Sequence, residues 1–242
     1  MEGRLGLDVV RRQIASVTGE SAKPRTPTGC DAIDAALGGG LDRGALHEVA
    51  AADHRATPAA LGFLLALTAI LAPTGPLFWP LAHGDFGAPY PPGLKAQGLD
   101  PARIVFALAR SREEQLWAME EALRLKAVAA VTGTRPARMD LTMSRRLQLA
   151  AEAACAPILL LRPHKDDELS AAVTRWRIAP LPASRDAHGF FARPRFAVAL
   201  ERARGGRQGE WAVEFDHAAL CLRLSADVPH RALSAGRAQS AA

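Results

Sequence analysis

Short apolar runs alternate with amphipathic segments over most of the chain. Five runs rich in Leu, Val, Ile and Ala have the length of strands buried on both faces of a parallel sheet. They are Leu46–Ala51, Pro76–Leu81, Arg103–Ala107, Ala127–Val131 and Ile158–Leu161. Helical spacing between and after them predicts helices at Ala59–Leu71, Gly93–Gln97, Arg112–Leu125 and Leu141–Ala154. This order favours an α/β fold with a mostly parallel, doubly wound and twisted sheet flanked by helices.

The last of these helices has a mixed surface. One apolar and one charged face are formed by Leu141, Arg145, Arg146, Leu149, Glu152 and Ala153. After Asp167 the period changes to an alternation of every second residue, which is typical of antiparallel strands. These strands are expected at Val173–Ala179, Arg195–Glu201, Gly209–Phe215 and Ala219–Leu224, with Gly205 and Gly206 turning one hairpin. The pattern therefore predicts a C-terminal antiparallel β extension.

The two ends of the chain have a different pattern. An amphipathic helix is predicted from Leu7 to Val17, with Val10, Ile14 and Val17 on one stripe. Gly19–Thr28 carries two prolines among small polar residues and is interpreted as a linker. A helix over Asp31–Leu37 follows and ends at three glycines. We expect an N-terminal helix and linker over residues 1–28, a core over 29–225 and a flexible tail over 226–242.

Composition adds limits on compartment and partners. The net charge of +5 and the pI near 9.6 permit contact with DNA or with an acidic partner, and a solvated arginine-rich surface would give the same values. Three separated cysteines, Cys30, Cys155 and Cys221, form no CxxC pair and have no histidine at metal spacing, so we expect buried small side chains, no metal site and a reducing cytosol. The polar start predicts no signal peptide, and the apolar stretch Ala59–Ala72 is too short to span a bilayer. These observations favour a cytoplasmic protein without a membrane segment.

The segment Ile33–Val49, which reads IDAALGGGLDRGALHEV, resembles the start of the RecA core. In that family a leucine–aspartate helix, a glycine turn and a strand with a central glutamate lead into the phosphate-binding loop. Gly75–Trp79 and Gly98–Ile104 are similar to the second strand, the loop and the third strand of the family. The resemblance covers roughly Thr28–Leu224 and implies a RecA-like P-loop core.

Among RecA relatives, the chain is most similar to the ImuA family, the RecA- and SulA-like proteins of bacterial mutagenesis cassettes. The similarity rests on the glycine-rich opening from Gly29 to Val49, on Ala60–Phe63 and on Leu159–Pro163. Several RecA relatives share the opening, so the two later segments carry the distinction.

The loop that would hold a nucleotide lacks the residues of a working phosphate-binding loop. Such a loop needs glycines, a lysine for the β- and γ-phosphates and a Ser/Thr hydroxyl for Mg²⁺. The segment Ala50–Pro58 reads AAADHRATP and contains no glycine. By spacing, Thr57 stands at the place of the lysine and Pro58 at that of the metal ligand, while Asp53 adds a negative charge. Arg55 is interpreted as a solvated loop residue.

Three further catalytic places of the RecA family have also changed. The Mg²⁺-ordering aspartate would follow the fourth strand, where the chain has Thr132 and Gly133. The catalytic glutamate would lie in Leu81–Asp85, whose His83 and Asp85 are more typical of polar loop residues. The γ-phosphate-sensing glutamine is replaced by Arg162–His164. Because four parts of a phosphoryl-transfer site are missing together, we expect no catalytic residues, no nucleotide or metal cofactor and no ATPase activity.

Contacts with DNA are expected to be weak. RecA grips DNA with two loops, and the corresponding segments here are a short basic one, Thr134–Arg138, and an acidic one, His164–Asp167. Other arginines are available for phosphate contacts: Arg145, Arg146, Arg175, Arg177, Arg193, Arg195, Arg202, Arg204 and Arg207. Aromatic residues near them could stack on bases: Trp176, Phe190, Phe191 and Trp211. The preferred alternative is an arginine-rich hairpin that lies over the domain or faces a protein.

The resemblance implies a non-catalytic accessory factor of SOS-induced translesion DNA synthesis. Its implied partners are ImuB, an inactive relative of Y-family polymerases, the error-prone C-family polymerase complex and RecA. The interface candidates are the N-terminal helix, the hairpin and the tail after Asp227; the named residues are Val10, Ile14, Val17, Arg193, Arg195, Arg202 and Arg204. A SulA-like inhibitor of FtsZ and a RecA-like DNA-dependent ATPase are the alternative functions.

Overall fold

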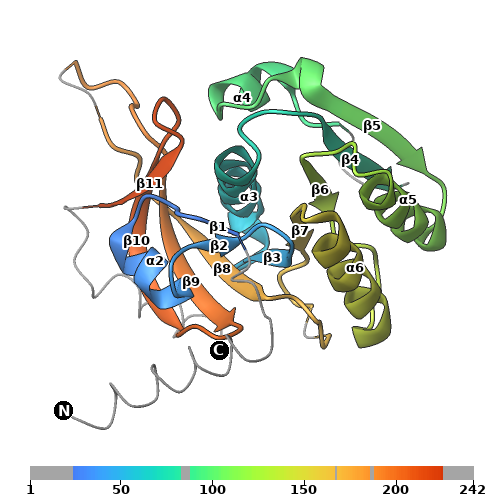
Figure 1. Cartoon of the computed structure of the whole chain (residues 1–242). Coiled ribbons are helices and arrows are strands. Elements are labelled where there is room, and N and C mark those ends of the chain that lie inside the picture. Colours follow the sequence, from blue (N-terminus) through green and yellow to red (C-terminus); the bar gives the residue numbers. More distant parts are fainter. Residues whose placement is uncertain (1–23, 83–87, 167, 186–187, 226–242) are drawn as a thin grey trace, which may run out of the picture.

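A nine-stranded sheet runs through the protein, whose computed structural model describes residues 24–82, 88–166, 168–185 and 188–225 (Figure 1). Its strands, in spatial order, are β11 (Cys221–Leu224), β10 (Gly209–Asp216), β9 (Arg195–Ala203), β8 (Thr174–Leu181), β3 (Leu46–Ala51), β7 (Ile158–Arg162), β6 (Ala130–Thr134), β4 (Leu77–Ala82) and β5 (Ile104–Ala109). A small second sheet pairs β1 (Arg25–Thr26) with β2 (Leu41–Asp42).

Neighbouring strands from β5 through β8 are parallel, and those from β8 to β11 are antiparallel. The predicted mostly parallel α/β sheet is therefore confirmed, and the C-terminal strands extend the same sheet. The prediction that the segment Val173–Ala179 is purely antiparallel was wrong, because β8 also pairs with β3 in parallel, with Glu48 opposite Arg175. Its alternating pattern reflects burial on one face only, which does not determine the direction of a neighbouring strand.

Helices cover both faces of the parallel part. The buried hydrophobic residues form two cores. One includes residues of α2 (Asp31–Leu37), α3 (Thr57–Leu71) and α4 (Pro91–Ala96), and the other includes residues of α5 (Arg112–Arg124) and α6 (Leu141–Ala154). Figure 1 shows α5 and α6 side by side, and their residues contact each other directly. The only helical run in the described part that is long and apolar enough to cross a membrane is His54–Leu71. It includes α3, whose buried side chains form the predicted core helix.

Glycine determines where the chain turns after α2. Gly38 caps the helix in the left-handed region, at φ 76°. Gly40 has φ 120°, and a Cβ there would lie 2.5 Å from the carbonyl oxygen of Thr26. The close approach brings β1 beside β2, so residues 25–26 of the expected linker form a strand. The predicted helix Leu7–Val17 and the tail over 226–242 lie outside the described residues.

Two smaller expectations also change. The strand predicted at Ala127–Val131 is observed as β6, three residues later. Of the cysteines expected to be buried, only Cys30 is; Cys221 is half-buried and Cys155 is exposed at the left-handed cap of α6.

A buried histidine joins the small sheet to the large one. His47 has no exposed surface, and its Nδ1 and Nε2 lie 2.8 Å from the Thr174 hydroxyl and 2.8 Å from the Asp42 carbonyl oxygen. Because a carbonyl oxygen can only accept, Nε2 carries the proton and donates to Asp42. In the neutral ring Nδ1 then accepts from the Thr174 hydroxyl. The oxygen of that hydroxyl also accepts from Trp176 Nε1. This arrangement needs a neutral ring, and burial lowers the pKa of His47 below its ordinary value of 6.5.

The pKa of His47 makes stability depend on pH. Below pH 6.5 the unfolded chain binds a proton at this position that the folded protein does not, so the free energy of unfolding should fall as the pH decreases. The expected contribution is about 1.4 kcal/mol per pH unit below the unfolded pKa. Urea denaturation between about pH 7.5 and about pH 5.5 measures it, with His47→Gln as the variant that lacks the slope and the exposed His54→Gln as the control that keeps it. Equal slopes in all three proteins would contradict the assignment.

Candidate functional site: a buried charge cluster and a closed loop

Glu48, in the middle of the central strand β3, is the centre of a buried charge cluster. Its side chain is 0% exposed and accepts hydrogen bonds from Ser170 Oγ at 2.8 Å and Arg175 Nε at 3.1 Å. Arg135 Nε and Arg162 Nε form ion pairs with its carboxylate at 3.4 Å and 3.5 Å. The arginines come from three elements, since Arg135 follows β6, Arg162 ends β7 and Arg175 lies in β8. The strand order β6-β7-β3-β8 places them around one carboxylate.

Asp166 supplies the second carboxylate of the cluster. It pairs with Arg135, and its backbone carbonyl accepts from Arg162. Three guanidinium groups, those of Arg135, Arg162 and Arg175, thus face two carboxylates, and the cluster has a surplus of one positive charge. Burial lowers the pKa of Arg162, and the charge of Glu48 opposes that effect. Because Arg135 and Arg162 side chains are only 1% and 3% exposed, these charges are held by the fold and are not available at its surface.

The cluster changes the interpretation of the segment expected to be a basic DNA-binding loop and of the place expected for a phosphate sensor. Arg135, in the segment interpreted as a basic loop, is buried and also donates to the carbonyl of Met139. Arg162, at the place of the γ-phosphate sensor, contacts Glu48 instead of the solvent. Sequence reasoning missed this cluster; the available signal was a glutamate within an apolar strand run and an arginine at the end of another.

The segment Ala50–Pro58 forms a short closed connection between β3 and α3. Asp53 accepts the backbone N–H of Ala56 at 2.9 Å and thereby caps a single turn of 3₁₀ helix over His54–Ala56. The N–H of Thr57 donates to the carbonyl of His54, and Pro58 has no N–H to offer. The N–H groups of Ala56 and Thr57 are therefore used inside the turn, and that of Ala52 donates to the carbonyl of Ile178. Arg55 is exposed as predicted.

The remaining predicted catalytic places are buried or lie outside the described residues. Thr132 is inside β6, with its Oγ1 3.3 Å from that of Thr68. At Gly133 a Cβ would lie 3.1 Å from Trp79 Nε1, so this strand packs against a ring. His83 and Asp85 are outside the described residues. Within the described ranges no group of three His, Cys, Asp or Glu side chains could hold a metal ion.

The hairpin arginines that were predicted as interface candidates have contacts within the chain. Arg193 pairs with Glu214 and Asp216, each at 3.0 Å, and Arg195 pairs with Glu214 at 3.4 Å. Arg202 and Arg204 donate instead to the backbone carbonyls of Ser170 and Ala171. The structure does not include the candidates Val10, Ile14 and Val17 among its described residues.

The aromatic residues near these arginines do not form one stacking surface. Trp176 is 1% exposed and packs against Phe63 at a ring distance of 5.6 Å, so it is not available to stack on bases. Its position on the α3 side of β8 explains the difference, since alternate residues of a strand face opposite sides. Phe190 and Phe191 are exposed, at 70% and 77%, and Arg185 lies over the Phe191 ring.

The fold and the site define a mixed α/β protein with a mostly parallel sheet whose central strands are joined by buried ion pairs. No protein-family model matches the chain. Two relatives do: Protein ImuA of Caulobacter vibrioides strain NA1000 / CB15N, and Protein ImuA of strain ATCC 19089 / CIP 103742 / CB 15 of the same species. Each is 36% identical over 218 residues, which cover 81% of this chain and 88% of the relative. The chain belongs to the ImuA family.

Removal of the central carboxylate should strongly destabilise the protein. In Glu48→Gln the shape of the side chain is kept, but the buried Arg135 and Arg162 and the half-buried Arg175 lose their shared counter-charge. The free energy of unfolding should fall by about 3–5 kcal/mol. Urea denaturation measures this loss. The control Glu113→Gln removes an exposed carboxylate that pairs with its neighbour Arg112, and it should leave the free energy of unfolding nearly unchanged. Similar losses in the two variants would show that Glu48 does not organise the cluster.

Proposed function

We propose that this protein is a non-catalytic, RecA-like accessory factor of SOS-induced translesion DNA synthesis that acts in the cytoplasm through contacts with other proteins. Membership of the ImuA family supports the cellular role. The observation that carries the non-catalytic part is the closed connection Ala50–Pro58. A P-loop leads from a strand to a helix at this kind of place, and here the N–H groups of Ala56 and Thr57 already donate within the turn.

A degenerate RecA-like P-loop core is the part of this proposal that concerns the fold. Its support is the order of elements: the first parallel strand, β3, leads through the connection into the buried helix α3. Glycine, lysine and Ser/Thr are absent from their expected places in the connection, and a proline follows Thr57. A phosphate group placed there would meet the Asp53 carboxylate, and it would find the N–H groups of Ala56 and Thr57 already engaged.

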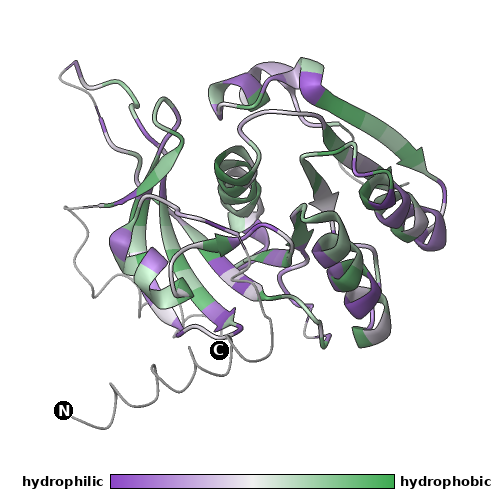
Figure 2. Ribbon diagram, viewed as in Figure 1, coloured by the Kyte–Doolittle hydropathy of each residue, from purple (hydrophilic) through white to green (hydrophobic). Residues whose placement is uncertain are grey.

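The proposed partners are ImuB, the error-prone C-family polymerase complex and RecA. The edge strand β5 supports a role in protein contacts. One side of its backbone pairs with β4, and within the described residues no strand pairs with the other. Val105, Phe106 and Leu108 are 55%, 37% and 70% exposed, and Trp117 on α5 is 60% exposed. Figure 2 shows that β5 is hydrophobic along its length. Exposed apolar edges of this kind are templates for added strands and marks of interaction sites.

Charges on this edge should weaken binding to ImuB. In the double variant Val105→Lys/Leu108→Lys, two desolvated ammonium groups would replace apolar contacts, and the affinity should fall by at least about tenfold. Capture of purified ImuB on immobilised protein, followed by titration in solution, measures this. Phe190→Lys is the control, because Phe190 is as exposed as Leu108 but lies in a loop. This variant should bind ImuB as the unchanged protein does.

The same variants test the cellular role. In a host that lacks its own ImuA, the unchanged chain and Phe190→Lys should restore damage-induced mutagenesis, and the β5 variant should not. No restoration by the unchanged chain, together with inhibition of FtsZ polymerisation in a light-scattering assay, would replace this proposal with the SulA-like alternative.

A further inference from the structure

Two hollows lie on either side of helix α6. The first, of about 380 Å³, lies between α6, the segment Ser170–Ala171 that precedes β8, and the end of β9, and its walls include Arg145, Glu152, Arg202 and Arg204. The second, of about 430 Å³, lies between α5 and α6. Leu149 lines both hollows, so together they form one continuous surface, which we call the α6 face.

The α6 face has positive charges without carboxylate partners. Arg202 and Arg204 donate to the backbone carbonyls of Ser170 and Ala171 at 2.6 Å and 2.7 Å, and these acceptors are neutral. Among the described residues no carboxylate lies within ion-pair distance of Arg145, Arg202, Arg204 or Lys126. In contrast, Arg124 and Arg146 pair with Glu121 and Glu120.

The buried charge cluster adds to the positive electrostatic potential of the α6 face. Ser170, whose carbonyl accepts from Arg202, donates its hydroxyl to Glu48, so the floor of the first hollow is attached to the cluster with its surplus positive charge. Burial, together with the neighbouring charges of Arg175 and Arg204, lowers the pKa of Arg202. Positive charge is thus concentrated here beyond what the chain's own carboxylates neutralise.

Exposed leucines lie beside these charges. Leu141 and Leu149 are 46% and 58% exposed, although the sequence pattern assigns them to the apolar side of the helix. The face that packs on the sheet consists instead of Ser144, Leu147, Gln148 and Ala151. Because residues at positions i, i+4 and i+8 share one side of a helix, Leu141, Arg145 and Leu149 form an outward stripe of alternating apolar and basic character.

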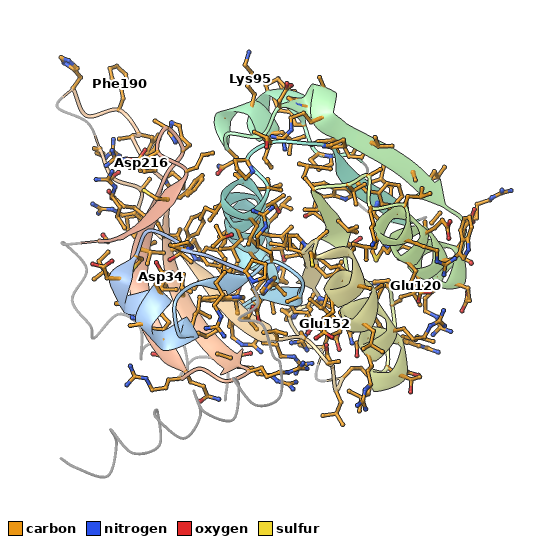
Figure 3. All side chains as sticks on the ribbon, in the orientation of Figure 1. Asp34, Lys95, Glu120, Glu152, Phe190 and Asp216 are labelled. Atoms are coloured by element: carbon orange, nitrogen blue, oxygen red, sulfur yellow. The ribbon has the colours of Figure 1, made fainter. Side chains whose placement is uncertain are left out.

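Neither terminal segment of the chain has a net negative charge to complement this face. Residues 1–23 contain four Lys or Arg against three Asp or Glu, and residues 226–242 contain two Arg against one Asp. A second copy brings a net charge of +5. Each hollow also contains one carboxylate, labelled in Figure 3: Glu120 pairs with Arg146, and Glu152 accepts from Gln148. A nucleic acid backbone offers no apolar side chain and would leave the leucines uncovered.

We propose that the α6 face is a docking site for an acidic peptide segment of a protein partner, in which carboxylates alternate with leucine-like side chains. The carboxylates would accept from Arg145, Arg202 and Arg204, and an apolar side chain would cover Leu149. This contact goes beyond the proposed function, since it uses a surface other than the β5 edge and its test does not involve ImuB.

A fluorescein-labelled peptide of sequence Asp-Asp-Leu-Glu-Asp-Leu is the probe, and fluorescence anisotropy measures its binding to the full chain. The unchanged protein should bind it at least about tenfold more tightly than the matched peptide with Asn and Gln in place of the acids. Raising NaCl from about 50 to about 500 mM should weaken binding, because the charges are exposed.

Two variants locate the site. Arg145→Gln/Arg204→Gln changes two exposed side chains and should weaken peptide binding at least about tenfold. Arg55→Gln/Arg110→Gln removes the same charge at exposed positions elsewhere and should leave binding within about twofold. Leu149→Gln, which keeps every charge, should weaken binding several-fold.

Three results would overturn the proposal: no peptide binding by the unchanged protein, equal binding by the two double variants, or equal binding of the acid and amide peptides. Labelled oligothymidylate is run in parallel. If it binds and depends on Arg145 and Arg204 while the peptide does not, the face is a nucleic acid site and the proposal is wrong.

Discussion

The buried carboxylate of Glu48 is the constraint on which the rest of the structure depends. A charge removed from water on a central strand costs several kcal/mol unless opposite charges and hydrogen bonds compensate it. Here the compensation comes from β6, β7 and β8 and from the connection around Ser170, so a single side chain ties four neighbouring strands and their following segments together. The chain after β6 and after β7 is fixed by this arrangement, because Arg135 and Asp166 pair with each other within it.

This constraint also explains where charge is found at the surface. Three arginines against two carboxylates leave the interior positive, and Arg202 and Arg204 next to it find only carbonyl acceptors. The antiparallel part behaves differently, since Arg195 lies opposite Glu214 in the β9–β10 register and its charge is neutralised across the strands. The proposed docking surfaces, the β5 edge and the α6 face, are two places where exposed apolar side chains or positive charges gather.

Local patterns predicted the central elements well. Three elements were predicted at their observed bounds: Asp31–Leu37, Leu46–Ala51 and Leu141–Ala154. The first ends at Gly38, the second ends before the connection that contains Asp53, and the third begins after the Asp140 cap. The start of β6 was misplaced, since Ala127–Ala129 continue its apolar run without a turn residue. Contacts between distant residues could not be predicted in this way: Arg175 follows Glu48 by 127 positions, and only the parallel pairing of β8 with β3 brings them together. The outward stripe of α6 was missed because the helix buries Gln148, which donates across to Gly44, in preference to Leu149.

The proposal that the fold serves as a docking scaffold depends on a closed connection between β3 and α3, and calorimetric titration of the pure full chain with ATP and Mg²⁺ tests it most directly. With the N–H groups of Ala56 and Thr57 engaged and the Asp53 carboxylate beside them, we expect no heat of binding and an affinity weaker than about 1 mM. A binding isotherm with an affinity of about 1 μM, abolished by Arg55→Ala, would contradict it.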